Sequence, residues 1–163
     1  MKAVATKAES QSELRFTRVY DAPRKLLFEV WTDPKHIMRW WGPRDFSVPH
    51  AEFDARSGGK LRIDFRGPDG VVFPNHGVVR EVVPWERLSF TTEYRHGGEE
   101  LLVELLHTAE FREEGARTRL DLTVEVLFAA PEAADSLAHM EQGTDEQLDK
   151  LAALVAAIKG EAS

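Results

Sequence analysis

The chain of 163 residues contains no cysteine. That absence excludes a disulfide scaffold, a thiolate zinc site, a cysteine nucleophile and an iron–sulfur cluster. No apolar run approaches the ~18 residues of a membrane-spanning helix, so we expect no membrane partner. Acidic residues outnumber basic ones by 28 to 21, and the net charge of −7 argues against a nucleic-acid partner, whose backbone is also negatively charged.

Catalytic motifs are equally scarce. No serine lies in a Gly-x-Ser-x-Gly elbow, and no glycine-rich loop opens a helix to hold a phosphate. His50, Glu52 and Asp54 share one face of an expected strand, but neighbours on one face lie about 7 Å apart, too far to hold one ion together. We therefore predict no metal, no cofactor and no catalytic residue.

The composition is that of a folded domain, with 42% hydrophobic and 30% charged residues. A chain of this length is expected to form one domain. Residues 1–12 are small or polar and show no periodicity, which predicts a disordered tail before a single domain at 13–160. They also lack the apolar stretch of a signal peptide, which favours a cytoplasmic location.

Hydrophobic periodicity changes along the chain from strand to helix, back to strand, and then to helix again. Residues 14–20 alternate as a strand, and Pro23 and Asp33-Pro34 each begin a short helix. Residues 46–128 alternate with a period of two between turns, which predicts a six-strand antiparallel meander.

The segment from Pro131 to about Lys159 is rich in alanine and has a helical pattern. Either the helix restarts at a capping box that begins at Thr144, or Gly143 lies within one longer helix. No other expected element is large enough to cover the apolar face of the sheet. The predicted fold class is therefore α+β, with a curved antiparallel sheet of about seven strands around a long C-terminal helix.

Seven short stretches occur in an order that is typical of one protein family. They are Asp21-Ala22-Pro23, Val30-Trp31-Thr32-Asp33-Pro34, Trp40-Trp41-Gly42-Pro43, Gly58-Gly59, Gly77-Val78-Val79-Arg80-Glu81-Val82-Val83-Pro84, Glu86-Arg87-Leu88 and Met140-Glu141-Gln142-Gly143. With them the chain resembles the activator of heat-shock-protein-90 ATPase homologue-like domains. These belong to the superfamily of START domains, polyketide cyclases and the birch pollen allergen (SRPBCC). The resemblance implies the helix-grip fold and a cavity between sheet and long helix.

Aromatic content and strand parity predict which side chains line that cavity. The predicted lining is Trp40, Trp41, Phe73, His76, Glu81, Phe90, His107 and Phe111. For the two tryptophans the alternative is that one indole plugs the fold and the other lies at the surface.

His107 has the parity of a core-facing residue, so its alternative is a hydrogen-bonded core histidine. Glu81 has an ambiguous face, and its alternative is a solvated carboxylate beside Arg80. Asn75-His76-Gly77 is either a bulge at the cavity wall or a turn-prone break in a strand.

Three functions follow as hypotheses. The first, which we prefer, is a non-enzymatic domain that binds a small hydrophobic or amphipathic ligand, with a stress-related role. The second is a protein-interaction module, because the resemblance implies a chaperone partner whose ATPase is stimulated. The third is a cyclase- or aromatase-type enzyme with His107 and Glu81 as acid and base. Both a monomer and a homodimer are compatible with the sequence.

Overall fold

The computed structural model describes residues 13–96 and 100–162, so the predicted tail at 1–12 lies outside the described residues. The strands are β1 (Glu13–Tyr20), β2 (Ser47–Phe53), β3 (Lys60–Arg66), β4 (Val72–Val83), β5 (Arg87–His96), β6 (Glu100–Glu114) and β7 (Arg117–Ala129). The helices are α2 (Arg24–Thr32), α3 (Pro34–Trp40), η1 (Pro131–Ala133), α4 (Ala134–Ala138) and α5 (Met140–Ala162).

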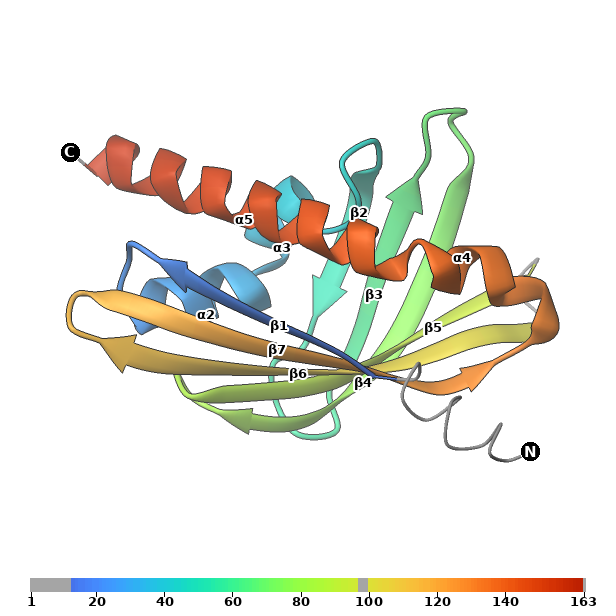
Figure 1. The fold of residues 1–163 in the computed structure, drawn as a ribbon, viewed down its shortest axis with the longest axis horizontal. Coiled ribbons are helices and arrows are strands. Elements are labelled where there is room, and N and C mark those ends of the chain that lie inside the picture. The colour runs from blue at the N-terminus through green and yellow to red at the C-terminus, as the bar shows by residue number, and fades with distance from the viewer. Residues whose placement is uncertain (1–12, 97–99, 163) are drawn as a thin grey trace.

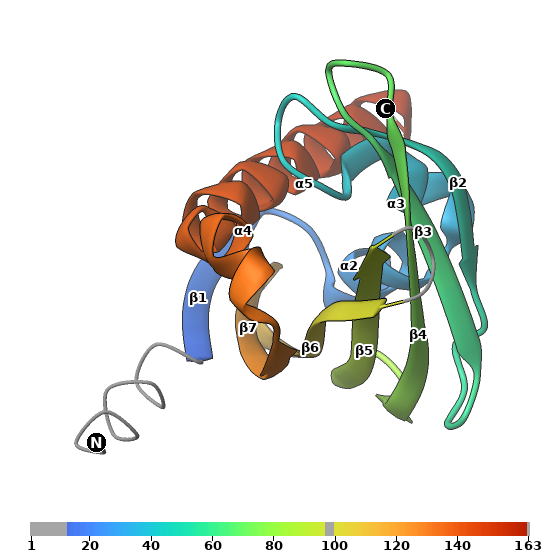
Figure 2. The same ribbon diagram turned by 90° about the vertical axis from the view of Figure 1, so that its right-hand side faces the viewer.

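The strands form one sheet in the order β1-β7-β6-β5-β4-β3-β2, and every neighbouring pair is antiparallel (Figure 1). The sheet curves, and α5 lies across its concave side (Figure 2). This arrangement confirms the predicted α+β class and the helix-grip fold. None of the helices in the described part of the chain is long and apolar enough to cross a membrane.

Of the two short helices between β1 and β2, α3 begins where the sequence predicts and α2 begins one residue later than predicted, with Pro23 as its N-cap. Pro34 is the first residue of α3, and the Asp33 carboxylate caps the helix by accepting from the Lys35 amide at 2.9 Å. The indole N–H of Trp40 donates to the carbonyl oxygen of Val30 at 2.9 Å, which ties the end of α3 to α2. Both helices therefore pack as one unit at one end of the sheet.

Helix α5 runs without a break through Gly143, which decides between the two predicted forms of the last segment. The break lies instead at His139, between α4 and α5. A Cβ atom at position 143 would lie 3.2 Å from Cγ of Pro43. Glycine therefore allows α5 to approach the segment after α3 closely, while Leu148 and Leu151 face the sheet and are fully buried.

The core contains a cluster of aromatic rings around Trp31. Its ring centroid lies 4.8 Å from Trp40, 5.7 Å from Trp41, 6.4 Å from Phe90 and 6.0 Å from Phe111. Most of these pairs meet edge to face, the arrangement that the ring quadrupoles favour. The cluster joins the two short helices to strands β5 and β6.

Gly77 of β4 lies so close to β5 that an added Cβ atom would overlap the carbonyl oxygen of Thr91. We expect Gly77→Ala to lower the free energy of unfolding by about 2–3 kcal/mol, because the two strands must move apart to admit the methyl group. Urea unfolding measures this loss. Gly160→Ala is the control, since no atom lies within 4 Å of its added Cβ. Equal stabilities of the two variants would contradict the prediction.

Candidate functional site

A cavity of about 450 Å³ lies between the sheet and helices α4 and α5. Its apolar lining is Trp41, Pro43, Phe46, Phe65, Phe73, Val103, Leu105, Leu122, Val124, Leu137 and Met140. Its remaining lining is Asn75, Thr92, Tyr94, His107, Ser136, His139, Gly143, Thr144 and Gln147. The volume falls within the roughly 300–1,000 Å³ of small-molecule sites, which are also mostly apolar with a few polar groups.

The strands supply their part of the lining through the alternation of side chains. Leu105 and His107 of β6 point to the concave side, and Leu122 and Val124 of β7 lie on the same side. The innermost lining, such as Trp41 and the two β7 residues, is buried, whereas Ser136 and His139 around α4 are exposed. The cavity therefore opens toward α4 and is closed by the core at its other end.

His107 is the most deeply placed titratable group of this lining. Its ring stacks on Phe90 with a centroid distance of 4.8 Å and an interplanar angle of 14°, and Trp41 covers it from another side at 5.7 Å. Its Nε2 atom lies 3.0 Å from the hydroxyl oxygen of Thr92. Burial lowers the pKa of His107 to about 4, so the imidazole is uncharged at neutral pH.

One wall of the cavity, residues 41–46, is held by side chains of α5. The Gln147 carbonyl oxygen accepts from the Gly42 amide at 2.8 Å, and the Glu146 carboxylate accepts from the Arg44 amide at 3.1 Å. The Lys150 ammonium donates to four main-chain carbonyls of this segment at 3.2–3.4 Å. Partial burial lowers the pKa of Lys150. Helix α5 thus sets the distance between the wall and the sheet.

Of the eight side chains predicted to line the cavity, the structure brings Trp41, Phe73 and His107 together on its wall. Neither tryptophan of the Trp40-Trp41 pair lies at the surface. The pair separates because Trp40 ends α3 and turns into the core, whereas Trp41 has an extended backbone and reaches the cavity.

Three of the predicted lining residues belong to the core instead. Trp40 is fully buried against Trp31. Phe90 lies beneath the ring of His107, and Phe111 packs against Phe28 with a centroid distance of 5.7 Å. Phe111 has the inward parity that the sequence predicts, and Phe90 also points inward, but other side chains stand between these residues and the cavity.

His76 and Glu81 lie on the outer face of the sheet and are exposed. The pairing of β4 with β5 shifts between Val79 and Glu81, so an alternation counted from Phe73 fails beyond that point. Glu81 is therefore the solvated carboxylate of its alternative prediction, and it accepts from Nε of Arg87 at 2.6 Å. The segment at 75–77 is neither a bulge nor a break, because it pairs with β3 in continuous register.

The deeply buried polar groups of the lining that are absent from the predicted set are Asn75, Thr92 and Gln147, each at least nine-tenths buried. Asn75 belongs to the Asn75-His76-Gly77 stretch, which the sequence singles out only as a bulge or a break. Thr92 lies on a strand whose parity could have placed it inward, but no motif marks it. Gln147 lies on α5, and only the packing of that helix turns it to the cavity. Within the described residues, no group of three His, Asp or Glu side chains could hold a metal ion.

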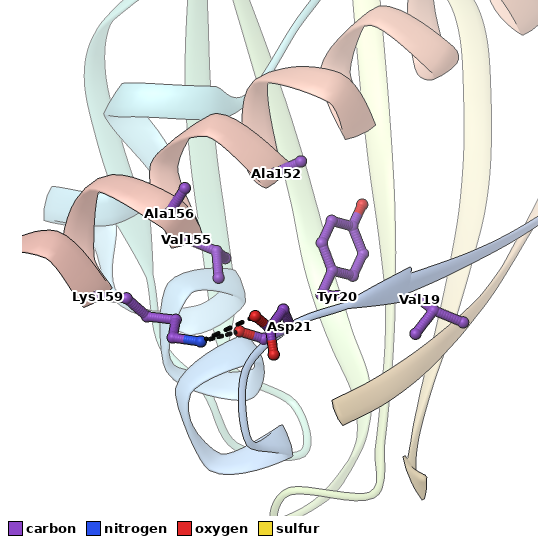
Figure 3. A pocket seen from close by; sticks show the side chains of 7 residues that line it. All are labelled: Val19, Tyr20, Asp21, Ala152, Val155, Ala156 and Lys159. Carbon is purple, nitrogen blue, oxygen red and sulfur yellow. Dashed lines mark hydrogen bonds and ion pairs between the residues drawn. The ribbon is translucent and has the colours of Figure 1, made fainter. Parts of the chain in front are cut away.

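A second hollow of about 390 Å³ lies between the end of β1 and the C-terminal half of α5 (Figure 3). At one side of it the Lys159 ammonium lies 3.2 Å from the Asp21 carboxylate and donates to the Asp21 carbonyl oxygen at 2.7 Å. The Tyr20 hydroxyl donates to the carbonyl oxygen of Leu148 at 3.2 Å. Because these polar groups already have partners in the protein, the larger cavity is the stronger candidate for a ligand site.

One family model and several solved structures match most of the chain. The family model described as Activator of Hsp90 ATPase homolog 1-like protein matches residues 21–156. No curated protein gives a significant match.

Several solved structures are similar to this chain. An AHSA1 protein from Silicibacter pomeroyi is 26% identical, with 89% of this chain and 98% of that chain covered and a TM-score of 0.72. A protein from Chromobacterium violaceum is 27% identical, with 88% and 96% covered and a TM-score of 0.73. A protein from Nitrosomonas europaea, 21% identical with 93% and 98% covered, shares the fold at a TM-score of 0.76.

Proposed function

We propose that this chain, which belongs to the family of activator of Hsp90 ATPase homolog 1-like proteins, binds a small hydrophobic or amphipathic molecule. The molecule lies in the cavity beneath α4 and α5, and the chain does not catalyse a reaction on it. The observation that carries the proposal is the cavity itself, about 450 Å³ of mostly apolar and aromatic lining with a few buried hydrogen-bonding groups. Apolar surface of this kind favours an apolar occupant over water.

The other two functions considered find less support. A cyclase-type mechanism with His107 and Glu81 as acid and base needs the two groups in one site, but Glu81 lies on the outer face beside Arg87. A chaperone partner would act on the outer surface and would leave the cavity without a role. The cytoplasmic location and the stress-related role stay predictions from the sequence.

The first experiment is native mass spectrometry of the purified protein, followed by solvent extraction of anything it carries. A discrete additional mass supports the proposal and gives the chemical class of the ligand. A clean mass of the chain alone, unchanged after incubation with lipids and aromatic compounds, contradicts it and directs the search to a protein partner.

Filling the cavity tests where the ligand binds. We expect Leu105→Trp to abolish binding, because its indole would occupy the cavity. Leu106→Trp is the matched control, since Leu106 is the next residue of β6 and points to the other face. A ligand at 100 times its dissociation constant should stabilise the wild type and the control by ~2.7 kcal/mol in thermal or urea unfolding, and leave Leu105→Trp unchanged. Equal stabilisation of both variants would place the ligand elsewhere.

A further inference from the structure

The lining of the cavity carries almost no charge. None of its described members is an Asp, Glu, Lys or Arg, although these four types make up 30% of the chain. The polar members are amides, hydroxyls and two histidines. His139 is exposed near the opening, and its Nδ1 atom lies 2.8 Å from the carbonyl oxygen of Asp135. The deep part of the cavity is therefore polar at a few points but uncharged.

One cation, Lys150, lies behind a wall of the cavity, but it does not add charge to the lining. Lys150 supports residues 41–46 from the side of α5, and its ammonium donates to the carbonyl oxygens of Trp41, Gly42, Pro43 and Phe46. It does not belong to the lining. An ammonium group has three N–H donors, so these four acceptors already use its capacity. A carboxylate in the cavity would therefore find no free cation among the described residues that line it.

The polar groups of the wall lie side by side on neighbouring strands. His107 of β6 and Thr92 of β5 are hydrogen-bonded to each other, and Asn75 follows on β4. Among the described residues, none hydrogen-bonds to Nδ1 of His107. A neutral imidazole has one donor and one acceptor nitrogen, and a hydroxyl can both donate and accept a hydrogen bond. The His107–Thr92 pair can therefore accept a hydrogen bond from a ligand hydroxyl or donate one to a ligand carbonyl.

We propose that the cavity selects an uncharged ligand with a hydroxyl or carbonyl group, which His107 and Thr92 hold, over a carboxylate with the same apolar body. This inference rests on the proposed function and adds the chemical class of the ligand. Its physical basis is the cost of removing an ion from water without a partner, which is far larger than the cost for a hydroxyl that finds a hydrogen bond. The low pKa of His107 agrees with it, since a neutral imidazole offers no counter-charge.

Pairs of probes that differ only in charge test this selection. At neutral pH, 2-naphthol is uncharged and 2-naphthoate is an anion, and the same contrast holds for decan-1-ol and decanoate. Isothermal titration calorimetry of the full chain with these four probes is expected to show each alcohol binding at least about 100-fold more tightly than its carboxylate. Equal or tighter binding of the carboxylates would overturn the selection and leave the proposed function standing. No binding by any of the four would overturn both.

The role of His107 is tested through a ratio of affinities. His107→Phe keeps a ring that can stack on Phe90 but removes the hydrogen-bonding nitrogens. We expect it to lower the affinity for 2-naphthol relative to naphthalene by about tenfold, the effect of one lost hydrogen bond. An unchanged ratio would show that His107 does not hold the hydroxyl, even if the variant binds both probes more weakly.

Adding a cation to the cavity should change the selection. Thr144 lies in the lining on α5 and is half-buried, so Thr144→Lys can place an ammonium beside the ligand. We expect at least tenfold tighter binding of 2-naphthoate. Ala153→Lys makes the same charge change on an exposed part of the same helix, outside the cavity, and should leave that affinity within about twofold. Equal effects of the two variants would contradict the proposal.

Discussion

Replacing Trp31 by alanine is expected to lower the free energy of unfolding by about 3–5 kcal/mol. Trp31 is fully buried, and its ring contacts four other aromatic rings that belong to α3, β5, β6 and the segment after α3. The truncated side chain would leave a cavity that these elements cannot close without moving. Urea unfolding followed by circular dichroism measures the loss, and the variant protein is expected to be unfolded well before the wild type.

Two further variants show whether the loss comes from packing. The indole N–H of Trp31 is buried and has no hydrogen-bond partner among the described residues, so Trp31→Phe removes an unsatisfied donor and keeps an aromatic ring. We expect it to cost less than about 1.5 kcal/mol. Trp85→Ala removes a tryptophan that is 46% exposed and should change stability by less than about 0.5 kcal/mol. If Trp31→Ala also lowered the free energy of unfolding by less than about 0.5 kcal/mol, the prediction that this ring is central to core packing would be wrong.

The second large effect is the dependence of stability on pH through His107. Burial lowers the pKa of its imidazole from 6.5 to about 4 in the folded protein, so the unfolded chain takes up the proton first as the pH falls. The stability that the neutral imidazole contributes is fully present above pH 6.5 and is lost as the pH falls toward 4. Each pKa unit corresponds to about 1.4 kcal/mol, so protonation of His107 should lower the free energy of unfolding by about 3 kcal/mol across this range.

The contribution of His107 is separated from that of other groups by comparison with His107→Phe. The other ionisable groups are present in both proteins, so their contributions cancel in the comparison. Urea unfolding at several pH values between 7 and 4 should give a steeper loss for the wild type than for the variant, by about 3 kcal/mol over the range. Parallel curves would show that the imidazole is already accessible to water in the folded state.

The helices and strands could be predicted from the sequence because their signals are local. Leu61 and Ile63 alternate with charged residues in β3, and both are buried as the period of two requires. Asp33 and Pro34 mark the start of α3 with a side-chain cap and a fixed backbone angle. Position 143 was ambiguous because whether a glycine interrupts a helix depends on what packs against it, here Pro43.

The cavity lining was only partly predictable. His107 has the predicted inward orientation because alternation is unbroken on its part of β6, whereas the shift near Val79 puts Glu81 on the other face. Parity shows the face of the sheet that a side chain points to, but not whether another side chain covers it. For this reason Phe90 and Phe111 lie in the core while Phe73 reaches the cavity.

The order of the elements, the apolar face of the sheet and the long helix that covers it follow from the amino-acid sequence alone, because each depends on neighbours within a few residues. Where the layers stand far enough apart to leave a cavity, and which polar groups enter it, depends on how the folded layers pack. That distance depends on contacts such as Gln147 with Gly42, which lie 105 residues apart in the chain. Local periodicity contains no information about such contacts, since they form only when the packed layers meet.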